Sequence, residues 1–288
     1  MNVNSSMQLT SIDQRNNLSV KEFESDYLRP GLPVVIKDTL TGWSAFNKWT
    51  PEFFRNTLGH KMVKINSKPM LLREFMEQVL ASSEEHPSAY LNEVNIHEHF
   101  PELLKDITPD IKYALPDRLR SRLFPKKWGL RNGVLELLIG GKGTKFPTLH
   151  FDGFHMNTFI TQIEGDKEFI LYTPDQTPYM YPEKVDSNHS LVNDVHNPDL
   201  KRFPLFANAK PVKVTVGAGD TVFLPAGWWH TTRLLSLSIA VSTNNVCRYR
   251  FGAFAKDFAT TAGNSPLKKM IFKNYINGVG MAMNIIGK

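Results

Sequence analysis

The chain has 288 residues, of which 41% are hydrophobic and 22% charged, as in globular rather than disordered or fibrous proteins. Its single cysteine, Cys247, excludes an internal disulfide and indicates a reducing compartment, so we expect a cytoplasmic protein, or a nuclear one if the source is eukaryotic. No apolar stretch has the length of a membrane span and residues 1–17 lack a signal-peptide-like run, so no membrane association is expected. The net charge of +6 permits binding to nucleic acid or acidic peptides without requiring it.

The N-terminal half mixes helix and strand signals. Residues 1–17 are expected to form a flexible leader. After it we predict a helix over 20–29, a strand over 32–38, a helix from Pro51 that is capped by Thr50, a strand over 61–66, a helix over 69–80 and a strand over 88–94. Residues 97–120 contain several prolines and are expected to be helical or irregular.

From residue 134 the pattern changes to short β-type segments separated by turns. Strands are predicted over 134–140, 148–152, 156–163, 167–172, 211–216, 220–225, 229–232 and 237–243. They predict a mainly β fold with flanking helices, whose core over about 134–246 is a double-stranded β-helix, the jelly roll of the cupin kind. The long connection over 174–210 suggests a binding role.

The chain after Cys247 is predicted to be helical. We expect residues 18–250 to form one domain and residues 251–288 to form a helical C-terminal region. Ser265 and Pro266 open its last helix. The apolar residues expected to share one face of that helix are Leu267, Met270, Ile271, Tyr275 and Ile276.

Three side chains from two segments form a candidate metal site. His150 and Asp152 lie two residues apart in a β-type context, so they point to the same side of an extended segment. His230 opens a strand after a Pro-Ala-Gly turn. Two histidines and one aspartate form the facial ligand set of non-haem iron oxygenases, and the lack of cysteine ligands favours Fe(II) or Mn(II) over structural zinc. The alternative is a pair of core histidines held by hydrogen bonds.

Lys167 is a second candidate, because it follows a tight turn and opens an apolar strand. Alternation places it on one face with Phe169 and Leu171, and a lysine inside a barrel needs an anion, such as a dicarboxylate. The alternative is a strand-end lysine in solvent. The aromatic residues that would form apolar walls of the site, or else pack in the core, are Phe151, Phe159, Trp228 and Trp229.

Several motifs occur in a fixed order along the chain. They are PGLPVVIKD (30–38), KWTPEFF (48–54), LLIG (137–140), TLHFD (148–152), QIEGDK (162–167), ILYTPDQ (170–176), NPDLKRFPLF (197–206) and GAGDTVFLPAGWWH (217–230). With them the chain resembles the JmjC branch of Fe(II)- and 2-oxoglutarate-dependent oxygenases. The pattern is similar to that of the hypoxia-inducible-factor asparaginyl-hydroxylase group and its cupin-like relatives, from about residue 23 to residue 246.

The resemblance implies a role for each matching residue. His150, Asp152 and His230 would hold Fe(II). Lys167 would pair with the distal carboxylate of 2-oxoglutarate, and Tyr90 would donate a hydrogen bond to the same carboxylate.

Further cosubstrate contacts are implied where the motifs depart from the family pattern. Asn244 would line the 2-oxoglutarate pocket. Thr148 stands one residue after the position of the family's threonine. The loop after Asp152 is about two residues longer than usual, so either Thr158 or its neighbour Asn157 would reach the cosubstrate.

The implied activity is a dioxygenase reaction in which O2 and 2-oxoglutarate are consumed and a side chain of a protein or peptide is hydroxylated. Residues 187–196 lack the Arg-Gln pair expected for the asparaginyl hydroxylase's peptide groove, so its substrate is not carried over. A modified tRNA base and a small molecule are the alternatives, and a non-catalytic cupin binding protein is an interpretation of another class. The resemblance also implies a homodimer formed through residues 266–286.

Overall fold

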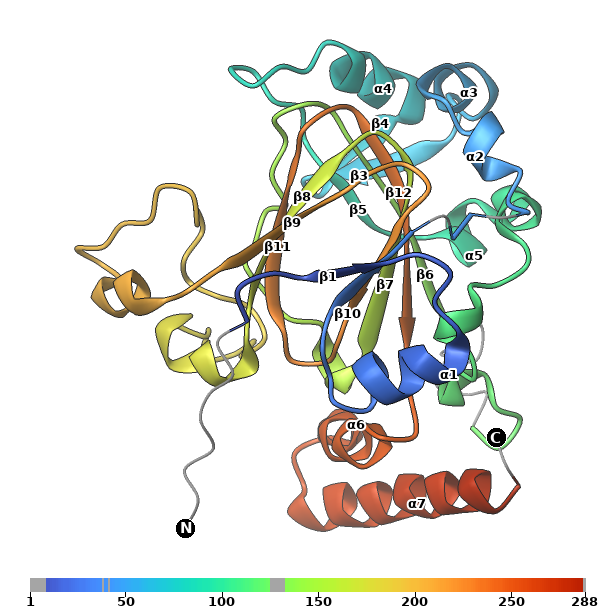
Figure 1. The fold of residues 1–288 in the computed structure, drawn as a ribbon, viewed down its shortest axis with the longest axis vertical. Helices are drawn as coiled ribbons and strands as arrows, with labels where there is room; N and C mark the ends of the chain where they lie inside the picture. Colours follow the sequence, from blue (N-terminus) through green and yellow to red (C-terminus); the bar gives the residue numbers. More distant parts are fainter. Residues whose placement is uncertain (1–8, 38, 41, 125–132, 287–288) are drawn as a thin grey trace.

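Two β-sheets face each other across an apolar interior (Figure 1). The structure is a computed structural model, and it describes residues 9–37, 39–40, 42–124 and 133–286. The large sheet has the order β1-β2-β10-β7-β12-β6-β5, and the small sheet has the order β11-β8-β9. The strands of the large sheet are β1 (Asp13–Arg15), β2 (Val34–Ile36), β5 (Leu91–Asn95), β6 (Val134–Gly140), β7 (Asn157–Glu164), β10 (Thr221–Leu224) and β12 (Ser238–Asn245). Those of the small sheet are β8 (Lys167–Tyr172), β9 (Val212–Val216) and β11 (Trp229–Leu234). The predicted mainly β fold with a double-stranded β-helix and flanking helices is confirmed.

The interior of this barrel is built from alternate residues of both sheets. Leu138, Ile160 and Ala240 come from the large sheet, and Phe169 and Leu171 come from the small one. Because successive side chains of a strand point to opposite faces, the residues between them are left for the outer faces of the sheets. Each sheet therefore has a second apolar surface that other elements must cover.

The N-terminal elements cover the outer face of the large sheet, where Phe159 and Phe223 pack against Phe23. Thr50 caps one of these helices through its side chain, as predicted. The elements are α1 (Val20–Phe23), the π-helix η1 (Glu24–Leu28), α2 (Ala45–Lys48), α3 (Pro51–Thr57), the β3 (Met62–Ile65) and β4 (Lys68–Leu71) hairpin, α4 (Leu72–Leu80), α5 (Ile96–His99) and the 3-10 helices η2 (Pro101–Ile107), η3 (Lys112–Ala114) and η4 (Arg118–Arg120).

The long connection over 174–210 covers the outer face of the small sheet. It contains the 3-10 helices η8 (Pro174–Tyr179) and η9 (Pro204–Asn208), and Phe206 packs against Tyr172 of β8. The C-terminal helices α6 (Phe251–Phe258) and α7 (Pro266–Ile285), joined by η10 (Ala259–Ala262), lie across one end of the barrel (Figure 1). None of the described helices combines the length and apolarity that a membrane crossing requires.

Some expected elements differ from the structure. Residues 148–152 are extended but form isolated bridges rather than a ladder, at His150 with His189 and with His230. Residues 69–71, which were predicted to be helical, belong to β4, because the backbone of β3 pairs with them before α4 begins. Asp13–Arg15 pair with β2, so the expected leader is wrong for these residues. Residues 1–8 of the leader and Asp38 of the predicted strand lie outside the described residues.

The last helix also differs in the face that it buries. Ile276 is fully buried, whereas Leu267 and Ile271 are 61% and 59% exposed. Ile276 is nine residues after Leu267, and at about 100° per residue this turns it to the opposite side of the helix. The predicted single apolar face is therefore wrong for Ile276, and α7 has two apolar faces.

Candidate active site

The nitrogen and oxygen ligand atoms of His150, Asp152 and His230 all lie within 4.8 Å of one another. β11 carries His230, and the extended segment after Pro147 carries the other two. The amide of His150 donates to the His230 carbonyl at 3.0 Å, and the amide of His230 donates back to the His150 carbonyl at 2.6 Å. Residues opposed in this way present their side chains on one side of the pair, and the two imidazole centroids are 4.3 Å apart.

Backbone carbonyls orient both imidazole rings. Nδ1 of His230 lies 3.0 Å from the carbonyl oxygen of Trp228, and Nδ1 of His150 lies 3.4 Å from that of Thr148. A carbonyl only accepts, so each Nδ1 carries the hydrogen and each Nε2 keeps a free lone pair. Burial and the neighbouring His230 lower the pKa of His150, which favours its neutral form. Two imidazole nitrogens and one carboxylate form a donor set that fits Fe(II).

Two side chains hold the carboxylate of Asp152. The hydroxyl of Thr158 donates to its Oδ2, and Nδ2 of Asn244 lies 3.3 Å from its Oδ1. Asn244 also donates to the Thr158 hydroxyl at 2.7 Å. Asn157 points to the other side of β7, where it bonds to Asn245. The structure thus places Thr158, rather than Asn157, beside the candidate metal ligands.

Lys167 points into the barrel, as its alternation predicts, and its side chain is completely buried. Its Nζ donates to the hydroxyl of Tyr90 at 3.1 Å. None of the ion pairs found among the described residues involves Lys167, and burial lowers its pKa to about 7. Burial also raises the pKa of Tyr90, so the phenol is neutral. The buried ammonium group of Lys167 bonds to a neutral hydroxyl and lacks an acidic partner among the described residues, so it is suited to bind an anionic ligand.

The interior face of β11 contributes one residue that sequence reasoning missed. Thr232 lies two residues after His230 and directly opposite Phe169, so it faces the same interior. Its buried hydroxyl lies beside Tyr90, yet it makes no hydrogen bond of good geometry among the described residues. The alternation that predicts the face of Lys167, applied onward from His230, would have identified it.

Other expected contacts lie elsewhere. Thr148 meets the site through its backbone carbonyl, which orients His150. Phe159 packs on the outer side of the large sheet with Phe223, so it forms no wall of the site. Phe151 packs edge-on against Trp229 outside the small sheet. Of the aromatic residues considered as walls, Trp228 is the one in the interior cluster.

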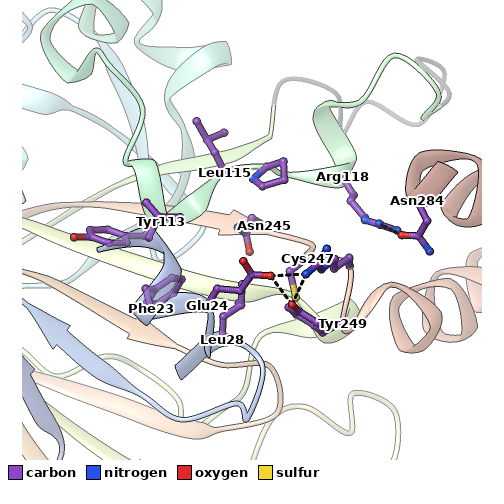
Figure 2. Close-up of a pocket in the computed structure, with 13 residues that line it drawn as sticks. Phe23, Glu24, Leu28, Tyr113, Leu115, Arg118, Asn245, Cys247, Tyr249 and Asn284 are labelled. Carbon is purple, nitrogen blue, oxygen red and sulfur yellow. Dashed lines mark hydrogen bonds and ion pairs between the residues drawn. The ribbon is translucent and has the colours of Figure 1, made fainter. Parts of the chain in front are cut away.

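A separate cavity of about 330 Å³ lies on the outer side of the large sheet (Figure 2). Arg248 and Tyr249 donate to Glu24 there, and Arg118 donates to Asn284 at its edge. No residue predicted for the metal or cosubstrate site lines this cavity. The candidate active site is therefore the barrel interior.

Comparison with known proteins identifies the class of this site. Residues 20–245 match the family model described as the Cupin-like domain. That match covers most of the chain, so the chain belongs to this family, whose JmjC branch is dependent on Fe(II) and 2-oxoglutarate. The family expectation is confirmed. The narrower likeness to the asparaginyl-hydroxylase group stays a prediction.

Three relatives illustrate the range of similar proteins. JmjC domain-containing protein D of Dictyostelium discoideum is 30% identical over 77% of this chain and 53% of its own length. Lysine-specific demethylase 8 of Danio rerio is 29% identical over 78% of this chain and 55% of its own. tRNA wybutosine-synthesizing protein 5 of Gallus gallus is 28% identical over 90% of this chain and 82% of its own. The chain spans about half the length of the first two.

Proposed function

We propose that this chain is an Fe(II)- and 2-oxoglutarate-dependent dioxygenase that hydroxylates a side chain of a protein or peptide. One observation carries the proposal: the His150–Asp152–His230 set shares its barrel interior with Lys167, a fully buried cation without an acidic partner among the described residues. The three candidate metal ligands alone would fit many metal ions. The lysine adds a site for the second carboxylate of a keto diacid.

Each group of residues would have a separate task. Bound Fe(II) would supply the activation of O2 and the oxidation of 2-oxoglutarate to succinate and CO2. His150, Asp152 and His230 would hold the metal. Lys167 would bind the distal carboxylate, and Tyr90 would donate its hydroxyl hydrogen to the same group once the ligand is present. The tasks of the chain are therefore to bind, to orient and to exclude water.

The pairing of β8 with β11 supports this separation of a metal end and a cosubstrate end in the interior. Lys167 is opposite Leu234, four residues along β11 from His230, which is about 13 Å at the usual rise of a strand. The lysine side chain and the cosubstrate would together span that distance. Leu171 is opposite His230, and Phe169 is opposite Thr232, between the two ends of this stretch; both contribute apolar surface to the interior. Apolar surroundings strengthen the attraction between the ammonium and a carboxylate.

Turnover of 2-oxoglutarate to succinate in the presence of Fe(II) tests the proposal. We expect wild-type protein to form succinate in the absence of added substrate at a slow rate. His150→Ala should lower that rate more than about a hundredfold, because even changes outside the ligand set cost ten- to a hundredfold. The control is His60→Ala, in the exposed turn between α3 and β3, with wild-type turnover expected. Equal turnover in all three proteins would reject the proposal.

A tRNA base is the second candidate substrate. It is favoured by the net charge of +6 and by the relative named for wybutosine synthesis, which aligns over 82% of its own length. The relative named lysine-specific demethylase 8 supports a protein substrate instead. Binding to tRNA should weaken steeply with salt. Absence of a mobility shift with total tRNA at low salt would remove this candidate.

We also propose that the chain forms a homodimer through α7. The opposite face of α7 packs on α6, while Leu267, Ile271, Met281 and Ile285 are more than half exposed. A row of large apolar side chains on one helix face supports a protein partner, and a second copy presents the same row.

The buried free thiol of Cys247 supports a reducing compartment, the cytoplasm or the nucleus.

A further inference from the structure

β11 presents alternate residues to the barrel interior. His230 comes first, at the metal end, and Thr232 and Leu234 follow on the same face. Lys167 of β8 is opposite Leu234. At the usual rise of a strand, Thr232 lies about 7 Å beyond His230, and Leu234 lies about as far again. Thr232 is therefore halfway between the candidate metal centre and the point where the lysine side chain begins.

The far end of this row is filled by two side chains that pack together over a glycine. A Cβ at Gly140 of β6 would lie 2.6 Å from the side chain of Leu234 and 3.2 Å from the ring of Tyr90. The absence of a side chain at Gly140 allows both residues to pack there. Leu234 and Tyr90 thus limit how far along β11 a ligand that is bound at the metal can extend.

The hydroxyl of Thr232 lies inside this limit and is not satisfied. It is buried and has no hydrogen-bond partner of good geometry among the described residues. Burial raises the pKa of Tyr90 and the Thr232 hydroxyl acts against this rise, so the two hydroxyls are close but poorly aligned. A buried polar group without a partner is unfavourable, so native proteins satisfy such groups with ordered water or a ligand.

Hydrogen-bond donors outnumber acceptors where these side chains meet. The ammonium group of Lys167 has three N–H donors and no acceptor, and its Nζ lies 3.1 Å from the Tyr90 oxygen. Tyr90 and Thr232 each add one O–H donor. A carboxylate only accepts, and its two oxygens offer about four lone pairs. One carboxylate could therefore accept hydrogen bonds from all three side chains.

We propose that Thr232 is a specificity-determining residue whose hydroxyl donates to the distal carboxylate of the keto diacid, together with Lys167 and Tyr90. This rests on the proposed function and adds a residue to the same site. The two threonines considered from the sequence have other contacts. Thr148 meets the site through its backbone carbonyl, and the hydroxyl of Thr158 donates to Asp152. The hydroxyl on β11 is free for the cosubstrate.

The position of Thr232 gives its hydroxyl a part in selecting the cosubstrate. A keto acid that is held at the metal by its keto end would bring its other end to this row of the interior. A second carboxylate there would satisfy the three donors, whereas a methyl group would leave them unpaired in apolar surroundings. Sites with buried polar groups reject ligands that leave those groups unpaired.

The experiment compares two ligands that differ only at the distal end. They are 2-oxoglutarate and 2-oxopentanoate, in which a methyl group replaces the distal carboxylate, and both are titrated into the Mn(II)-loaded full chain by isothermal titration calorimetry. We expect Thr232→Val to weaken the binding of 2-oxoglutarate about tenfold, because a hydrogen bond to a charged group is lost. The affinity for 2-oxopentanoate should change by less than about twofold, since it has no distal acceptor.

Further variants assign the effect to the hydroxyl. Thr232→Ser keeps the donor and should bind 2-oxoglutarate within about threefold of the wild type. Thr231→Val is the matched control and should bind as the wild type does, because Thr231 is also buried in β11 but is opposite Ile170 on the outer face. Thr232→Ala provides the same comparison should the valine variant fail to fold.

Stability gives a second measurement, in which a structural role would show itself. The free energy of unfolding of metal-free Thr232→Val should equal or exceed that of the wild type, because a methyl group replaces an unpaired buried hydroxyl. A hydroxyl that served only to hold Tyr90 in place would instead make the valine variant less stable.

The outcomes separate this inference from the proposed function. Thr232→Val that binds 2-oxoglutarate as tightly as the wild type overturns the inference, because the hydroxyl would then serve a water molecule or Tyr90. Equal weakening of both ligands also overturns it, because the loss would not depend on the distal carboxylate. In both cases the binding of 2-oxoglutarate by the wild type leaves the proposed function standing. A Mn(II)-loaded wild type that does not bind 2-oxoglutarate would overturn the proposed function and, with it, the inference.

Discussion

At position 167 a lysine occupies a place in the small sheet where its neighbours on the same face are Phe169 and Leu171. Its ammonium has lost its hydration and has gained one hydrogen bond, to Tyr90. Burial therefore lowers its pKa to about 7. Such a residue destabilises the ligand-free protein, and a bound dianion would remove the penalty.

Lys167→Met tests this penalty through stability. Because the pKa of Lys167 is lowered, between about pH 7 and the ordinary value of 10.5 the unfolded chain binds more protons than the folded chain, so the contribution of Lys167 to the free energy of unfolding rises with pH. We expect Lys167→Met to stabilise metal-free protein by about 1–3 kcal/mol at about pH 6, and by less at about pH 9.

Urea denaturation of both proteins across this pH range gives the difference directly. Lys213→Met, on the outer face of β9, serves as the control and should show little pH-dependent difference. A Lys167→Met protein that is less stable than the wild type by the same amount at every pH would contradict the buried-charge account.

The hydroxyl of Thr158 orients a metal ligand without contacting the metal itself. Thr158→Val removes the donor to Asp152 and leaves the volume nearly unchanged. We expect the affinity for Mn(II), measured by isothermal titration calorimetry, to fall about tenfold or more. Thr161→Val is the matched control, because Thr161 lies on the outer face of the same strand and bonds to Thr221. Equal affinities in the two variants would show that Asp152 needs no such support.

The candidate site could be predicted at the level of residues where periodicity and chemistry agree. His150, Asp152, His230 and Lys167 are ionisable groups in apolar extended segments, and alternation correctly gives the inward face of Lys167. The choice between Asn157 and Thr158 could not be made from the sequence, because the register of β7 decides which of the two faces the interior. The pairing of β7 with β12 and the hydrogen bonds of both side chains show that Thr158 does.

At the scale of elements, two glycines of α7 differ in what surrounds them. A Cβ at Gly280 would lie 2.4 Å from the ring of Phe251, whereas a Cβ at Gly278 would meet no atom within 4 Å. Gly280 thus allows α7 to approach α6, whereas Gly278 makes no close approach within the chain.

The pair gives a matched test of helix docking. Gly278→Ala should raise the free energy of unfolding by about 0.5–1 kcal/mol through helix propensity. Gly280→Ala should lower it by about 1–3 kcal/mol, because the Phe251 ring must move. Thermal or urea denaturation measures both. Stabilisation by both substitutions would mean that α7 is not packed against α6 in this way.

The predictable elements are those whose signals are local. Thr50 and Pro51 start a helix, Ser265 and Pro266 start another, and Lys167–Tyr172 form the predicted strand. The hairpin partner β4 was not predictable, because Met70 and Leu71 also fit a helical pattern and only pairing with β3 decides between the two. Tertiary context overrides local preference at such positions.

At the scale of the whole molecule, α6 contacts both α7, which carries the proposed dimer face, and the turn that follows Asp152. Phe258 of α6 packs on Phe154 and Asp257 pairs with His155 at 2.7 Å, both in the 3-10 turn η7 (Gly153–His155) that follows Asp152. Phe154 and His155 have positive φ angles, so this turn needs support from outside. Within the expected C-terminal region, α6 thus packs against the turn beside the candidate site.

The dimer proposal is tested on the exposed face of α7. Ile271→Glu combined with Met281→Glu places charges in the apolar row, where the wild-type side chains are 59% and 66% exposed. We expect light scattering to give a dimer mass for the wild type and a monomer mass for this variant. Lys273→Glu, elsewhere on the helix, should remain dimeric. A wild-type monomer at micromolar concentration would contradict the proposal.

The central claim is that one barrel interior binds both a metal through His150, Asp152 and His230 and a keto diacid through Lys167. Anaerobic titration of Fe(II) and 2-oxoglutarate into the protein, followed by visible charge-transfer absorption of the chelated keto acid, measures both at once. The account predicts one band that saturates at one Fe(II) per chain, is absent in His230→Ala, and requires much higher 2-oxoglutarate in Lys167→Met. No band in the wild type, or an equal band in His230→Ala, would contradict it.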